Sequence, residues 1–74
     1  MKVRDLLNRL SMASNAKVTV YDASCEGGKE WKMFYDAMRQ NNYCKWEGDK
    51  KVDVGALKLN HFLVYNNEIV IYAD

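Results

Sequence analysis

The sequence has few of the features that would by themselves assign a function. It contains two cysteines and one histidine, and no apolar run is long enough to span a bilayer. Its 11 Lys and Arg residues nearly balance 10 Asp and Glu residues, which leaves a net charge of +1. A binder of the DNA backbone would show a basic excess, so we expect neither DNA-backbone binding nor membrane insertion. The charged start MKVRDLLNRL is unlike a signal peptide, which makes a cytoplasmic location the default expectation.

The residues that usually carry chemistry are scattered. Cys25 and Cys44 lack the Cys-x-x-Cys spacing of zinc sites and redox motifs, so we expect two reduced thiols. His61 with a thiol would make a nucleophile and base pair, but nothing in the spacing brings them together, and a histidine on a sheet surface is favoured. The carboxylates match no calcium-binding loop. We therefore predict a protein that is not an enzyme and has no cofactor and no metal site.

Length and apolar content predict one domain over residues 1–74. With 49% hydrophobic residues the chain can build a single core. Val3, Leu6, Leu7 and Leu10 recur at the spacing of one helical stripe and predict a helix over residues 3–12. The alternating segment KVTVYD predicts a strand over residues 17–22.

The middle of the chain is less regular. Gly27 and Gly28 predict a hairpin loop over residues 23–29, because a phosphate-binding loop would need a longer glycine pattern. Residues 30–41 fit either one helix or a strand followed by a helix, and we favour a strand over 31–34 and a helix over 36–41. Residues 42–55 are predicted to form an exposed loop. In it, Tyr43 and Trp46 either pin the loop to the core or project as anchors toward a partner.

The segment from His61 to Ala73, HFLVYNNEIVIYA, predicts the structure around which the rest is arranged. Asn66 and Asn67 separate two apolar runs and favour a two-residue type I′ turn between antiparallel strands. Tyr65 then pairs with Glu68, and the pairing continues outward to His61 and Tyr72. Because side chains alternate along a strand, one face is predicted to be core and the other to be apolar and aromatic. The predicted core face holds Phe62, Val64, Ile69 and Ile71, and the opposite face holds His61, Leu63, Tyr65, Glu68, Val70 and Tyr72.

This opposite face is the candidate binding site. If the two hairpins pair into one sheet, Tyr21 joins it, on the side away from the first helix. Tyrosines suit a protein interface, and they also stack on nucleobases. Two alternatives remain open: a homodimer through the C-terminal strand at a sheet edge, and burial of this face under residues 42–55. The candidate residues are Tyr21, His61, Leu63, Tyr65, Val70 and Tyr72, with Tyr43 and Trp46 as loop anchors.

The elements together predict an α+β fold. An N-terminal helix packs on an antiparallel sheet of two hairpins, and a short second helix lies between the hairpins, in the order α-β-β-α-β-β.

The opening MKVRDLLNRL, the strand KVTVYD, a glycine-bearing turn and the closing NNEIVIYAD resemble the small early proteins of bacteriophages and prophages. The resemblance implies an inhibitor of host defence, either an anti-CRISPR protein that blocks a nuclease complex by binding it or a sponge that sequesters a nucleotide immune signal. It assigns no individual residue. We expect a non-enzymatic protein that binds a host protein complex in the host cytoplasm, with an oligomeric nucleotide sponge as the first alternative. A structural or oligomerisation module, or an orphan enzyme fragment, is the second.

Overall fold

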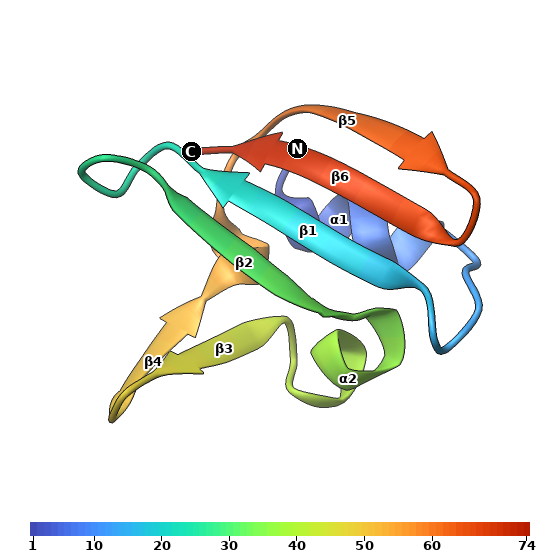
Figure 1. Ribbon diagram of the computed structural model, residues 1–74, viewed down its shortest axis with the longest axis horizontal. Coiled ribbons are helices and arrows are strands. Elements are labelled where there is room, and N and C mark those ends of the chain that lie inside the picture. Colours follow the sequence, from blue (N-terminus) through green and yellow to red (C-terminus); the bar gives the residue numbers. More distant parts are fainter.

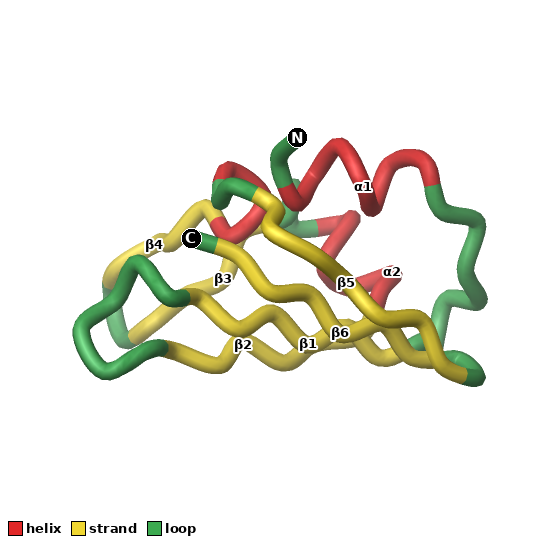
Figure 2. The backbone as a smooth tube through the Cα atoms, turned by 90° about the horizontal axis from the view of Figure 1, so that it is seen from above, coloured by secondary structure: helices red, strands yellow, loops and turns green.

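A four-stranded sheet forms one layer of the protein, and both helices lie on one of its faces (Figure 2). A computed structural model describes residues 1–74. The helices are α1 (Val3–Arg9) and α2 (Tyr35–Gln40). The sheet contains β1 (Lys17–Asp22), β2 (Lys29–Phe34), β5 (Leu59–Tyr65) and β6 (Glu68–Ala73) in the order β2-β1-β6-β5 (Figure 1).

The predicted α+β fold is confirmed, and the two hairpins do join into one sheet. They meet through β1 and β6, which run parallel, so the sheet is mixed and not antiparallel throughout. The first strand has the predicted bounds, and residues 29–40 form a strand followed by a helix, as favoured. Neither helix is long and apolar enough to cross a membrane.

The first helix is shorter than predicted. It ends at Arg9, and Leu10 is extended with φ −86° and ψ 143°. The buried hydroxyl of Tyr35 lies 3.0 Å from the carbonyl oxygen of Leu7 and 2.8 Å from that of Leu10. A helix end leaves carbonyl groups without intrahelical partners, and Tyr35 reaches two of them from another element with its single O–H donor. Because this contact joins residues far apart in the sequence, the local pattern of residues 3–12 could not predict where the helix ends.

Residues 42–55 are not the predicted irregular loop. They form a second, two-stranded sheet of β3 (Cys44–Glu47) and β4 (Lys50–Asp53), followed by the 3-10 turn η1 (Val54–Ala56). Tyr43 and Val54 are buried in the core on the helix side of the main sheet. The segment therefore leaves the opposite face of the main sheet uncovered (Figure 2).

The core lies between the main sheet and the helices. Val18, Val20, Ile69 and Ile71 face it from the two central strands and are completely buried. The helices contribute Val3, Leu6, Leu7, Tyr35 and Met38.

Two residues predicted to be core are not covered. Phe62 and Val64 lie on the same face as Ile69 and Ile71, as the pairing register requires, but they are 40% and 56% exposed. The reason is their strand: β5 is an edge strand and projects past α1, which lies behind β1 and β6 (Figure 1). The alternation of side chains along the strand predicted the correct face for Phe62 and Val64. It does not indicate whether another element covers that face.

The predicted edge position of the last strand is wrong. β6 lies between β1 and β5, so its backbone groups are paired on both sides and it has no free edge for a dimer. The hairpin register is confirmed from Tyr65 with Glu68 to His61 with Tyr72. The turn type is not: only Asn67 has a positive φ, of 52°, whereas a type I′ turn needs positive φ at Asn66 as well.

Candidate binding face and open strand edge

The sheet face turned away from the helices carries a row of stacked rings. Tyr21 on β1 pairs with Tyr72 on β6, which pairs with His61 on β5. The rings of Tyr21 and Tyr72 stack with 5.3 Å between centroids and 17° between planes. Those of Tyr72 and His61 stack at 4.4 Å and 15°. Neighbouring strands place these side chains in register, so the row follows directly from the pairing.

Two further rows lie beside the first, and Glu30, Lys32 and Phe34 of β2 continue the three rows at the sheet edge. Thr19, Val70 and Leu63 form the second, and Lys17, Glu68 and Tyr65 form the third. We call the surface the outer face; it contains all six sheet residues predicted as a binding site: Tyr21, His61, Leu63, Tyr65, Val70 and Tyr72. Tyr21, Leu63 and Tyr65 are 39%, 44% and 57% exposed, so the face is open to solvent, and its apolar part lies toward β5 and β6.

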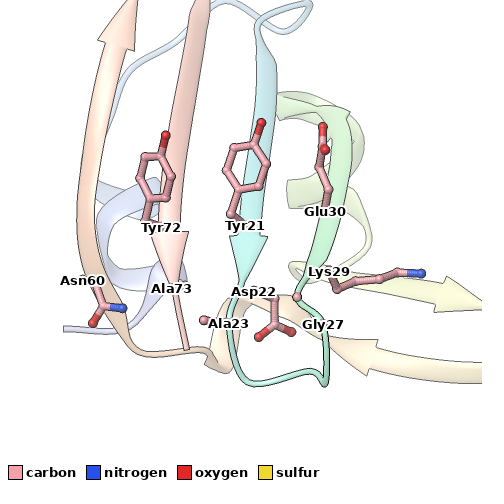
Figure 3. Close-up of a pocket in the computed structure, with 10 residues that line it drawn as sticks. Tyr21, Asp22, Ala23, Gly27, Lys29, Glu30, Asn60, Tyr72 and Ala73 are labelled. Atoms are coloured by element: carbon pink, nitrogen blue, oxygen red, sulfur yellow. The ribbon is translucent and has the colours of Figure 1, made fainter.

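A shallow depression of about 520 Å³ lies at one end of the outer face. Figure 3 shows the rings of Tyr21 and Tyr72 side by side above it, with Asn60 on one flank and Lys29 near the β1–β2 loop. It is open and mixed in polarity, unlike the enclosed apolar pocket that usually holds a small molecule.

Asp22 holds the loop beside this depression. Its carboxylate is almost fully buried and accepts hydrogen bonds from the Ser24 backbone and hydroxyl, from the Cys25 thiol and from the Trp31 indole. Burial raises the pKa of Asp22, but these hydrogen bonds, with Ser24 contributing most, outweigh it and hold the pKa below its ordinary value. Sequence reasoning missed this role, although an Asp two residues before a Ser is a common turn signal.

The two thiols are free, and Cys25 has a structural contact. Its hydrogen bond to Asp22, with partial burial, raises the pKa of the Cys25 thiol. A raised pKa lowers the fraction of reactive thiolate. No three His, Cys, Asp or Glu side chains lie close enough together to hold a metal ion.

Of the two predicted loop anchors, one is buried and the other is exposed. Tyr43 is 7% exposed and its hydroxyl hydrogen-bonds the Asn8 side chain, so it pins the segment to the core and is not a binding anchor. Trp46, on β3, is 61% exposed. It lies on the separate β3–β4 sheet and does not extend the outer face.

The two edges of the main sheet differ in protection. Lys29, Glu30 and Lys32 on the β2 edge carry charges that discourage strand pairing. The Lys45 ammonium also donates to the Lys32 carbonyl oxygen, and Lys29 forms an ion pair with Glu47 at 2.9 Å. The β2 edge is therefore covered by charged side chains.

The β5 edge has no such protection. Residues 60–67, NHFLVYNN, contain no Lys, Arg, Asp, Glu or Pro. Only the start of β5 is covered by the N-terminal residues. There the backbones of Lys2 and Lys58 form an isolated antiparallel β-bridge, and the Leu59 N–H donates to the Met1 carbonyl oxygen. From His61 to Tyr65 the edge has no neighbouring strand.

Comparison with protein-family models, with curated proteins and with solved structures found no match to this chain.

Proposed function

We propose that this chain is a small non-enzymatic binding protein that acts by protein–protein contact through its outer face. The observation that carries the proposal is the open row of Tyr21, Tyr72 and His61, with Leu63 and Tyr65 beside it, on a face that no other segment covers. Contiguous apolar surface with several aromatics is typical of a partner site. Tyrosine supplies contact area and a hydroxyl at low entropic cost.

The ring geometry favours a protein over a nucleobase as the partner. Bases bind proteins by lying flat on aromatic rings. The rings of Tyr21 and Tyr72 already face each other, and Tyr72 also stacks on His61. An incoming base can lie flat only at the two ends of the row, on the outward ring faces of Tyr21 and His61. A protein partner instead contacts the ring edges and hydroxyls of the whole surface.

The partner that the phage-like layout implies is a host defence complex of the CRISPR–Cas kind, which the chain would meet in the host cytoplasm. The near-neutral charge supports recognition by shape and apolar contact, without electrostatic steering.

A nucleotide sponge is the second candidate. The observation that favours it is the depression beside Tyr21 and Tyr72, where Lys29 and Asn60 offer polar groups. A sponge binds its ligand without a protein partner. The purified chain would then be stabilised thermally by a cyclic dinucleotide or an ADP-ribose derivative.

The test is an interference assay in cells that carry an active CRISPR–Cas system and a targeted plasmid. The wild-type chain is expected to restore plasmid survival, and the double variant Tyr21→Ala/Tyr72→Ala is expected to lose that effect. Both residues lie on central strands, so the variant leaves the β5 edge intact.

The matched control is Trp46→Ala, which removes a more exposed aromatic, 61% against 39% for Tyr21, from the β3–β4 sheet and should retain the effect. Full activity of the tyrosine variant, or loss of activity in the control alone, would contradict binding through the outer face. Thermal melts of each variant verify that it is folded.

A further inference from the structure

The hydrogen-bond pattern of the sheet fixes which backbone groups of β5 face outward. In the parallel pair of β1 and β6, the Lys17 N–H donates to the Asn67 carbonyl oxygen at 3.0 Å. Backbone groups of successive residues point to opposite sides of a strand, so those of Glu68 point toward β5. Glu68 pairs with Tyr65, whose own N–H and C=O therefore point toward β6.

The same alternation assigns the rest of β5. Like Tyr65, Leu63 and His61 direct their backbone groups at β6. Phe62 and Val64 direct theirs at the open edge. The free edge therefore offers two N–H donors and two C=O acceptors, spaced evenly about Leu63.

The side chains along this edge are the most apolar exposed group on the molecule. Eight large hydrophobic residues are exposed, and four of them are consecutive on β5. Phe62 and Val64 are exposed on the helix side of the sheet, and Leu63 and Tyr65 on the outer face. A long, uncharged, apolar edge is what proteins normally avoid unless another strand pairs with it.

We propose that two copies of this chain pair antiparallel through β5, about a two-fold axis at Leu63, to form a homodimer with one continuous sheet. The Phe62 N–H and C=O of each copy bond to the Val64 C=O and N–H of the other. Leu63 faces Leu63 of the second copy in a pair without hydrogen bonds.

The second copy fits this edge better than a different chain for two reasons. The uncovered segment from His61 to Tyr65 is centred on Leu63, so it meets its own image over its whole length without a charge on either side. In that register His61 lies opposite Tyr65 of the second copy. The ring row, which ends at His61 in one chain, then continues across the axis.

The area that a stable interface must bury also favours a dimer in which side chains on both faces of β5 make contacts. A stable interface buries about 800 Å² per partner, which is about a sixth of the 4798 Å² exposed by this chain. Backbone pairing alone falls short of that area. The exposed side chains of Phe62 and Val64 on one face, and of Leu63 and Tyr65 on the other, supply the remainder.

The dimer shares Leu63 and Tyr65 with the outer face, but it does not use Tyr21 and Tyr72, the two residues that test the proposed function. Tyr21 and Tyr72 lie on central strands and remain accessible in either a monomer or a dimer. Failure of the dimer leaves binding through the outer face intact, and failure of the outer face leaves the dimer intact.

The test is molar mass by light scattering over a series from micromolar to millimolar concentration. The wild-type chain of 8.6 kDa is expected to reach twice that mass. Leu63→Lys places two ammonium groups opposite each other at the axis, and we expect a monomer. Phe34→Lys makes the same kind of change at the 54% exposed Phe34 on β2 and should remain a dimer. A monomeric wild type, or a dimeric Leu63→Lys variant, would overturn the proposal.

Cross-linking tests the register in a chain whose native cysteines are replaced by serine. The Cα atoms of an antiparallel pair without hydrogen bonds are about 4.5 Å apart, within the range of about 4.4 to 6.8 Å that a disulfide spans. Leu63→Cys is therefore expected to oxidise to a covalent dimer. Val64→Cys lies opposite Phe62 and not opposite its own copy, so it should not. Equal cross-linking at both positions, or none at Leu63→Cys, would refute this pairing.

Discussion

The imidazole of His61 stacks on the ring of Tyr72 at 4.4 Å, and no strand lies on the other side of His61. His61 therefore belongs to both surfaces that we propose for association, the outer face and the β5 edge. It closes the ring row of the outer face, and it stands at the start of the unprotected β5 edge. An aromatic stack that ends at an open edge can be extended by another ring, from a partner or from a second copy.

The outward N–H of Val64 gives a sharp prediction for proline. Proline removes a backbone donor and is tolerated on a strand edge where that donor faces solvent. Val64→Pro is therefore expected to fold and to be monomeric, whereas Leu63→Pro removes a ladder hydrogen bond to β6 and should destabilise the fold by about 1 to 3 kcal/mol. Circular dichroism and urea unfolding measure the difference. If the two proline variants are equally destabilised, the assignment of outward groups is wrong.

Replacing Asp22 by asparagine should destabilise the protein and flatten its response to acid. The carboxylate accepts hydrogen bonds from Ser24, Cys25 and Trp31, so Asp22→Asn is expected to cost about 1 to 3 kcal/mol at pH 7.

The acid response follows from the lowered pKa of Asp22 in the folded state. A lowered pKa contributes stability above the unfolded value of about 4, and this stability is lost as the pH falls through the folded value. Urea unfolding at pH 7 and pH 3 should show the gap between wild type and Asp22→Asn shrinking at pH 3. A gap that stays constant would contradict the assigned role of the carboxylate.

Tyr35→Phe should weaken the end of the first helix. The variant keeps the ring and removes the hydroxyl that reaches the carbonyl oxygens of Leu7 and Leu10, with an expected cost of about 1 to 2 kcal/mol. Tyr21→Phe is the control, because its hydroxyl projects from the outer face, and it should change stability by less than about 0.5 kcal/mol (Figure 3). Equal effects of the two changes in thermal unfolding would argue against the cap.

Gly55 should not tolerate a side chain. An added Cβ would lie 2.5 Å from the Tyr43 Cβ and 3.0 Å from the Arg4 Nε. Tyr43 is buried and hydrogen-bonded to Asn8, so it cannot move away. Gly55→Ala is expected to cost about 1 to 3 kcal/mol. Gly48→Asn, at an open turn with φ +63°, should have little effect because asparagine tolerates that conformation.

The sequence predicted the parts of the fold that depend on local patterns. The two-residue Asn66-Asn67 loop and the strict alternation after it determine the register of the last hairpin, since a shift by one residue would reverse every side chain. The same alternation placed Tyr21 and Tyr72 on one face. The open outer face follows from these two facts and from the position of the helices.

Long-range relationships were not predictable in this way. The parallel pairing of β1 with β6 joins segments about fifty residues apart and leaves no trace in either segment alone. For the same reason the pattern could not show that β5, and not β6, is the edge strand. The strands β3 and β4 are short and rich in charge, so their alternation resembled an exposed loop.

The central claim is that this chain works by association through the outer face of its sheet. The most direct measurement is its affinity for each of a panel of purified CRISPR–Cas effector complexes, compared with that of Tyr21→Ala/Tyr72→Ala and of the control Trp46→Ala. We predict that one complex binds the wild type and the control equally, and binds the double variant at least about 30-fold more weakly, since a central aromatic hot spot contributes about 2 kcal/mol or more. Equal binding by all three proteins, or no binding of the wild type to any complex, would contradict the account.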